Sequence, residues 1–257
     1  MPISRVTFLD TPFDLVDQAR VLECLDTTNR QAPLRYVVTP NADHVVRCAQ
    51  SPAMAEIYHQ AWLSLCDSRV VVRVARAKGY PMDEVVTGSD LTTALFERVL
   101  TPKHRLTIIG GSDELVHRLR SRYRLGTLYH HNPPIGFIHD EAAVATCCRF
   151  VADHPADFVL LAVGSPQQER LAARLATTPG CQGVALCIGA SLLFLTGFER
   201  RAPSWMSRAG LEWLYRLGQN PRRLWRRYWN NLALFPLAWR APRFKATGLA
   251  HRDLEIE

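Results

Sequence analysis

One acidic side chain in this sequence stands where a general base could act. Asp67 lies in the segment Leu65-Cys66-Asp67-Ser68, between a long amphipathic stretch and an apolar run. A carboxylate held beside a substrate hydroxyl can take its proton as the oxygen attacks. A carboxylate in such a connection can equally cap a helix or shape a turn. The residue type and its place therefore leave both interpretations open.

Small and polar residues follow four short apolar runs, and they are the second set that could do chemistry. These residues are Thr39, Asn41, Gly110, Gly111, Gln168, Glu169 and Gly189. Glycine backbone and the free N–H groups at a helix start can approach a phosphate, and the polar side chains can hydrogen-bond a sugar. Ordinary turns use the same residues, and Gln168 stands at the capping-box position relative to Ser165. Binding and purely structural roles both remain open here.

The usual carboxylate pair that holds a metal–nucleotide complex is missing, because no Asp-x-Asp occurs in the sequence. Of the nine histidines, His44, His130, His131 and His139 are considered as ligands, and they do not have a metal-ligand spacing. We therefore expect neither a metal nor an organic cofactor.

The elements that must position these residues alternate along the first two-thirds of the chain. Apolar, β-branched runs predict strands, and amphipathic stretches between them predict helices. The predicted strands are 35–39, 69–73, 106–109, 157–163 and 183–188, and the predicted helices are 43–64, 89–100, 113–124, 140–153 and 167–177. This order predicts an α/β fold: a Rossmann-like, mostly parallel sheet with helices on both faces. Ligands bind such sheets beyond the carboxyl ends of the strands, where the polar residues stand.

The C-terminal fifth differs from the rest in charge and in tryptophan content. From Glu199 to Lys245, ten Arg and one Lys stand against two Glu, whereas the remaining residues are near neutral. Asn220-Pro221 predicts a helix start, with Trp, Tyr, Leu and Phe on one side and Arg on the other. Such a helix either anchors a protein at an anionic membrane surface or packs on its body with a solvated Arg face. We expect two units: a catalytic domain over 1–198 and a basic, helical, membrane-associating appendage over 199–257.

Composition limits the remaining classes. Apolar residues make up 47% of the chain, enough for a packed core, and no apolar stretch is long enough to span a bilayer. The N-terminus carries no secretory signal pattern. Seven cysteines without a Cys-x-x-Cys pair predict reduced, buried thiols in a cytoplasmic protein.

Taken in order, the motifs resemble those of one family over roughly residues 5–240. They are Thr39-Pro-Asn41-Ala-Asp43-His44, Asp67, Thr87-Gly88-Ser89-Asp90, Ile109-Gly110-Gly111, Gly164-Ser-Pro-Gln-Gln168-Glu169, Gly189-Ala-Ser191, Arg201-Ala-Pro203, Gly210-Leu-Glu-Trp-Leu-Tyr-Arg216 and Asn220-Pro-Arg222. This set is similar to that of the WecG/TagA/CpsF family, glycosyltransferase family 26.

The resemblance implies a concrete activity. Family members transfer a sugar from a UDP-sugar to a polyprenyl-diphosphate-linked sugar, with inversion and without a metal, in bacterial surface polysaccharide synthesis. By motif, Asp67 matches the catalytic base, and Thr39, Asn41 and Gln168 match pocket residues. The basic residues Arg201, Arg216, Arg222 and Arg223 match or adjoin those expected to meet the lipid diphosphate. The protein is then expected to be peripheral at the inner face of the cell membrane.

Three positions depart from the family pattern. Ser68 stands where Gly usually follows the Asp, Leu193 where an Asp usually follows the Gly-Ala-Ser motif, and Val85 lies in a segment where many members carry an Arg. The donor sugar is therefore left open. These departures also suggest an alternative, a catalytically weakened scaffold of a polysaccharide assembly complex.

A nucleic-acid-binding protein is a further alternative, suggested by the isoelectric point of about 9.2 and the Arg- and Trp-rich segment. That alternative leaves the polar strand ends unexplained, so we do not expect nucleic acid as a partner. A dinucleotide-dependent oxidoreductase would need a glycine fingerprint that the chain lacks. The oligomeric state is open.

Overall fold

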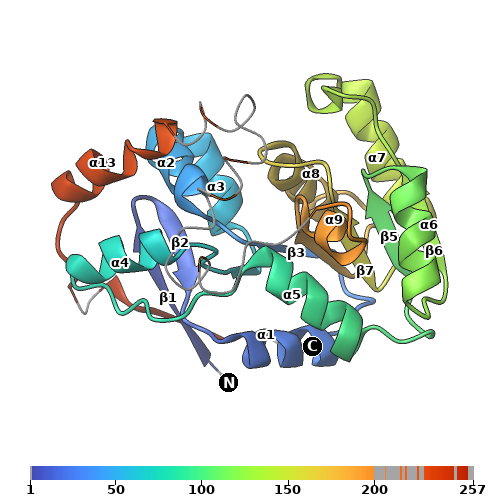
Figure 1. Cartoon of the computed structure of the whole chain (residues 1–257), viewed down its shortest axis with the longest axis horizontal. Helices are drawn as coiled ribbons and strands as arrows, with labels where there is room; N and C mark the ends of the chain where they lie inside the picture. Colours follow the sequence, from blue (N-terminus) through green and yellow to red (C-terminus); the bar gives the residue numbers. More distant parts are fainter. Residues whose placement is uncertain are drawn as a thin grey trace.

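The computed structural model describes residues 2–199, 206, 215, 218, 225, 229–245 and 248–253. Within them, a six-stranded sheet forms the centre and a three-stranded sheet lies beside it (Figure 1). The order of strands in the main sheet is β4-β3-β8-β7-β5-β6, and each neighbouring pair is parallel. The strands are β3 (Arg35–Val38), β4 (Leu63–Ser64), β5 (Leu106–Ile109), β6 (Leu128–His131), β7 (Phe158–Leu161) and β8 (Val184–Cys187). The predicted α/β class with a parallel sheet is confirmed.

Alternating side chains of the strands build two apolar layers. In β7, Phe158 and Leu160 belong to one buried cluster, and Val159 and Leu161 belong to the other. This division follows from the two-residue period of a strand. Because both faces are covered by helices, every residue of this strand is apolar and buried, as expected of a parallel sheet.

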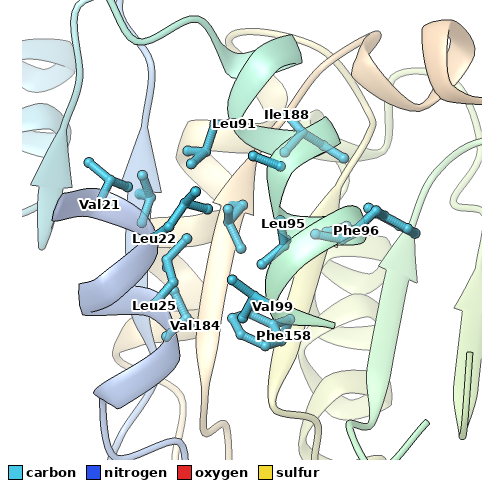
Figure 2. Packing of buried hydrophobic residues seen from close by; sticks show 14 of the residues in the cluster. Val21, Leu22, Leu25, Leu91, Leu95, Phe96, Val99, Phe158, Val184 and Ile188 are labelled. Carbon is cyan, nitrogen blue, oxygen red and sulfur yellow. The ribbon is translucent and has the colours of Figure 1, made fainter. Parts of the chain in front are cut away.

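Four helical segments cover the first face: α1 (Gln18–Thr27), α5 (Gly88–Ala94) with the π-helical turn η1 (Leu95–Val99), α6 (Asp113–Arg122) and α9 (Ser191–Leu195). Figure 2 shows Leu22 and Leu25 of α1 and Leu95 and Val99 of the α5–η1 segment gathered over Phe158 of the sheet. The second face is covered by α2 (Ala42–Gln50), α3 (Pro52–His59), α7 (Glu141–Asp153) and α8 (Gln167–Ala176), with a short 3₁₀ turn η2 (Phe137–His139) before α7.

A third cluster joins the smaller sheet to the C-terminal part of the chain. This sheet has the order β2-β1-β9, from β1 (Pro2–Phe8), β2 (Thr11–Asp14) and β9 (Ala250–Asp253), and both pairings are antiparallel. The helices α4 (Arg69–Ala77) and α13 (Leu234–Arg240) pack with it, and α13 lies against α2 and α4 (Figure 1). The division into units 1–198 and 199–257 stays a prediction.

The predicted strand at 69–73 is wrong, because this segment is the start of α4. Ser68 caps the helix by accepting from the Val71 N–H, and Val71, Val72 and Ala75 then fall on one buried face. The Val-rich composition suggested a strand, but the spacing of the buried residues is helical.

The predicted single helix at 43–64 is also wrong in its length. Ser51 ends α2 and caps α3, Pro52 begins α3, and the chain then enters β4. Serine followed by proline is a typical helix start, so the long apolar pattern hides two helices and a strand.

All seven cysteines are buried and free, which confirms the prediction of reduced, buried thiols. None of the helices among the described residues has both the length and the apolar character needed to cross a bilayer.

A buried ion pair fixes the small sheet to the edge of the large one. Arg5 donates to both carboxylate oxygens of Asp14, at 2.6 and 2.7 Å, and both side chains are almost fully buried. Asp14 Oδ2 also accepts from the backbone N–H of Ser64 in β4, at 2.7 Å, and Arg5 donates to the carbonyls of Ala61 and Trp62. The pair therefore holds the two-residue strand β4 from the side that has no neighbour in the main sheet.

We predict that Asp14→Ala lowers the free energy of unfolding by about 3–5 kcal/mol, because it leaves a buried guanidinium and a backbone N–H unpaired. Urea denaturation measures the change. The matched control is Glu114→Ala, which removes the exposed partner of Arg118 and should cost less than about 1 kcal/mol. Equal losses in the two variants would contradict a special role for the buried pair.

Candidate functional site

The carboxyl ends of the parallel strands bring the predicted site residues to one edge of the sheet. Asp67 follows β4, Thr39 and Asn41 follow β3, Gly189 follows β8, Gln168 stands beyond β7, and Gly110 with Gly111 follows β5. This is also the order of the strands in space, so residues far apart in the sequence occupy successive strand ends. Three strand spacings separate β4 from β7, on the order of 14 Å.

Asp67 is oriented by backbone groups of two other segments. Its N–H donates to the Pro40 carbonyl at 3.0 Å, which ties it to the loop after β3. Its Oδ2 accepts from the Gly88 N–H at 3.2 Å, at the start of α5. As a residue, Asp67 is partly exposed. A carboxylate held in this way has the fixed geometry that a general base requires.

Gly88 also brings Thr39 next to Asp67. A methyl group placed on Gly88 would come within 2.9 Å of Thr39 Oγ1 and 3.7 Å of Asp67 Oδ2. The hydroxyl and the carboxylate therefore border the same glycine, and the Thr87-Gly88-Ser89-Asp90 motif supplies the space between them. The adjoining thiol of Cys66 is not a candidate nucleophile, because burial raises its pKa to about 12.

Asn41 shapes the loop after β3. Its side-chain oxygen accepts from the Asp43 N–H at 3.1 Å, and its own N–H donates to His44 Nδ1 at 3.1 Å, so it is the N-cap of α2. Of the two roles considered for Asn41, the structural one is present.

Gln168 does not cap its own helix. Pro166 stands at the N-cap position of α8, without a side-chain capping bond. Instead, Gln168 Oε1 accepts from the Gly189 N–H at 2.8 Å, and Gln168 Nε2 donates to Glu169 Oε1 at 2.8 Å. The amide thus links the loops after β7 and β8. Glu169 lies behind it and is 1% exposed.

Gly110 and Gly111 form a tight turn between β5 and α6, with φ of +93° and +79°. A Cβ on Gly110 would lie 2.7 Å from Val163 and 2.9 Å from the Ala162 backbone, so only glycine fits there. Ser112 caps α6 through the Leu115 N–H. The turn is built for close approach, and the N-terminus of α6 points the same way as the strand ends.

Arg47 is a site residue that the sequence did not suggest. Its guanidinium donates to the Ser165 hydroxyl at 2.9 Å and pairs with Asp43 on the same helix. This contact ties α2 to the loop after β7. The available signal was the spacing of Asp43 and Arg47, four residues apart on a helix that begins after Asn41.

The four arginines predicted to meet a lipid diphosphate, Arg201, Arg216, Arg222 and Arg223, lie outside the described residues. Of the helix predicted to start at Asn220, the structure describes residue 225 and the residues from 229 onward. Its apolar side is described at Trp225, Trp229, Leu232 and Phe235, and all four side chains are exposed. Trp239 on α13 extends this set and is 83% exposed.

Comparison with known families agrees with this arrangement. The model of the glycosyl transferase WecG/TagA/CpsF family matches residues 6–248, which include every strand end of the site. The chain belongs to the WecG/TagA/CpsF family. It is therefore a glycosyltransferase, and the resemblance drawn from its motifs is confirmed.

One curated relative of this WecG/TagA/CpsF chain comes from Bacillus spizizenii (strain ATCC 23059 / NRRL B-14472 / W23). It is an N-acetylglucosaminyldiphosphoundecaprenol N-acetyl-beta-D-mannosaminyltransferase. The two sequences are 29% identical over 234 residues, which cover 88% of this chain and 85% of the relative.

We predict that Gly88→Ala lowers turnover roughly ten- to hundredfold, because the added methyl displaces Thr39 beside Asp67. The fold should not suffer, since alanine is the better residue in a helix. Steady-state kinetics and thermal unfolding measure the two effects. Adding Thr39→Ser, whose side chain turns more freely, should restore part of the loss. Full activity in Gly88→Ala would contradict the close packing of this corner.

Proposed function

We propose that this enzyme transfers a hexose or N-acetylhexosamine from a UDP-sugar to a polyprenyl-diphosphate-linked sugar, with inversion, in bacterial surface polysaccharide synthesis. The observation that carries the proposal is the Asp67 carboxylate, held by the Gly88 N–H beside Thr39 at the strand ends. The name of the Bacillus spizizenii relative supports the choice of a lipid-diphosphate-linked acceptor.

In the proposed reaction, Asp67 takes the proton from the acceptor hydroxyl. The acceptor oxygen attacks the anomeric carbon of the donor as the bond to the diphosphate breaks, and UDP leaves. Attack from the face opposite the leaving group inverts the anomeric centre. We propose that Thr39 and Asn41, which follow β3, and Gln168, which lies beyond β7, help to hold the sugars.

The departing diphosphate must be stabilised as its charge develops. The backbone N–H of Gly111, before α6, and N–H groups at the start of α8 can contribute, because helix N-termini favour anions. Arg201, Arg216, Arg222 and Arg223 are proposed to bind the lipid diphosphate or the leaving group, since guanidinium binds phosphate oxygens in pairs. The absence of Asp-x-Asp from the sequence supports a mechanism without a metal.

We assign the segment 199–257 to the membrane surface, with the protein peripheral at the cytoplasmic face. The acceptor lipid resides in a membrane, and an exposed row of Trp225, Trp229, Leu232, Phe235 and Trp239 suits the interface between headgroups and acyl chains. The net charge of this part of the sequence suits anionic lipids.

We predict that Asp67→Asn lowers kcat about a thousandfold, because the amide keeps the shape of the carboxylate but cannot accept the proton. UDP release is followed with a panel of UDP-sugars and a short-chain polyprenyl-diphosphate N-acetylglucosamine or glucose. The matched control, Asp26→Asn, changes an exposed carboxylate near the end of α1, outside the proposed site, and should leave kcat unchanged.

Two outcomes would count against this assignment. Full turnover in Asp67→Asn would remove it as the base. Loss of wild-type turnover on adding a chelator would overturn the metal-independent mechanism. If no donor–acceptor pair gives product with the folded wild-type protein, that result would favour the alternative of a catalytically weakened scaffold.

We predict that the combined change Trp229→Ala, Phe235→Ala and Trp239→Ala weakens binding to anionic vesicles at least about tenfold, since each large apolar side chain contributes on the order of 1.5–3 kcal/mol when buried. Sedimentation with vesicles measures binding. Ile135→Ala is the control, because Ile135 is fully exposed but belongs to the loop before η2. Unchanged sedimentation of the triple variant would refute this membrane surface.

A further inference from the structure

A fully buried carboxyl group stands directly behind Gln168. Glu169 is 1% exposed, and its Oε1 accepts from Gln168 Nε2 at 2.8 Å. Its Oε2 is buried without a hydrogen-bond partner among the described residues. Carboxyl groups are rarely placed in such surroundings, because removing their charge from water is costly. The burial of Glu169 therefore needs a reason beyond the packing of α8.

The surroundings of Glu169 favour its neutral form. Burial raises its pKa, and this effect outweighs the nearby Gln168 and Ser165 side chains and the Arg47 guanidinium, which act in the opposite direction. Next to the Gln168 amide, this carboxyl group acts as a hydrogen-bond acceptor. Glu169 is too deep to touch a substrate, and Gln168 is itself only 4% exposed, so any effect of Glu169 reaches the surface through the Gly189 loop that Gln168 holds.

The contact between Gln168 and Glu169 is unusual for a helix. Adjacent helical residues point about 100° apart and do not normally face each other. Here the Gln168 amide turns back to Glu169 with its nitrogen, while its oxygen accepts from the Gly189 N–H. Two hydrogen bonds with opposite polarity leave only one orientation of the amide, because a flipped amide would oppose Glu169 Oε1 with oxygen and the Gly189 N–H with nitrogen.

We propose that Glu169 is a positioning residue for glycosyl transfer: it fixes the buried Gln168 amide in the one orientation that holds the Gly189 loop in place. This inference rests on the proposed function in that the partly exposed Gly189 loop is taken to line the substrate site. The chain Glu169 Oε1, Gln168 Nε2 and Oε1, Gly189 N–H then aligns the loops after β7 and β8 with each other.

Two substitutions separate positioning from other roles. Glu169→Gln keeps an acceptor oxygen for the Gln168 amide and removes only the ionisable group, so kcat should stay within about threefold of wild type. Glu169→Met keeps the length but removes the acceptor, so kcat should fall on the order of a hundredfold from misalignment. Thr107→Val is the control for Glu169→Met, because it removes another buried polar atom without a partner, within β5, and should leave kcat unchanged.

A double-mutant cycle tests whether Glu169 acts through Gln168. Adding Glu169→Met to Gln168→Ala should cost little further activity, because the group to be positioned is already gone. If the two substitutions lowered kcat by independent factors that multiply in the double variant, Glu169 would not act through Gln168, and this result would overturn the proposal. So would a Glu169→Gln variant that folds but has lost turnover, since that would require a charge at this position.

Hydrogen exchange at the Gly189 amide gives a readout that does not depend on turnover. The amide should be protected in wild type and in Glu169→Gln, and it should exchange faster in Glu169→Met. Should Glu169→Met fail to fold, Glu169→Gln remains decisive, because it must retain both activity and protection. If the Gly189 amide is protected but the wild-type protein shows no turnover, that result would count against the proposed function. It would not contradict the hydrogen-bonded chain from Glu169 through Gln168 to Gly189.

Discussion

All six strands of the main sheet run in the same direction, and this constraint decides where every loop of the site lies. Parallel strands have their carboxyl ends at one edge, so the residues after β4, β3, β8, β7 and β5 meet there although more than a hundred positions separate them in the sequence. The outermost of these strands, β4, has only two residues and one neighbour. Asp67 follows this strand closely, and the buried Arg5–Asp14 pair holds the strand from the other side. The place of the proposed base is thus set by the N-terminal hairpin as much as by the sheet.

The sequence predicts the centre of the sheet well and its edges poorly, for a physical reason. The runs at β7 and β8 are continuously apolar, and those at β3 and β5 contain one polar residue each, because these strands are flanked by neighbours and covered on both faces. The edge strand β4 is too short to show a pattern, and β6 contains Tyr129, His130 and His131, whose partly exposed side chains break the apolar run. The valines of 69–73 were misleading because β-branched residues indicate a strand, whereas their burial follows the helical period of α4. Likewise, the small sheet depends on a pairing between β1 and β9 that no local pattern reveals.

Several residues that the motifs singled out lie at one edge of the sheet, but the order of the motifs did not indicate what each residue contacts. Asp67 and Thr39 stand together because of Gly88, a contact that follows from the placement of α5 and not from any spacing in the sequence. Gln168 had the spacing of a capping residue, yet it bonds across to Gly189 and back to Glu169. Consecutive residues of a motif can face a ligand or the core, and the sequence alone does not distinguish these two placements. The contact of Arg47 was not predicted, because its partner, Ser165, lies far away in the sequence, in the loop after β7.

Because all seven cysteines are buried, their thiols can report local unfolding of the native protein. The thiols are distributed over both faces of the sheet, and burial raises the pKa of Cys48, Cys147 and Cys181 to about 11, so in the closed protein they are both covered and protonated. A thiol-reactive dye can then label only molecules that have opened at the cysteine concerned. Two of the reporters sit at the site itself, because Cys66 adjoins Asp67 and Cys187 ends β8 just before the Gly189 loop. Comparing the labelling rates of the seven cysteines would show whether the edge at the carboxyl ends of the strands opens separately from the core, without an introduced cysteine.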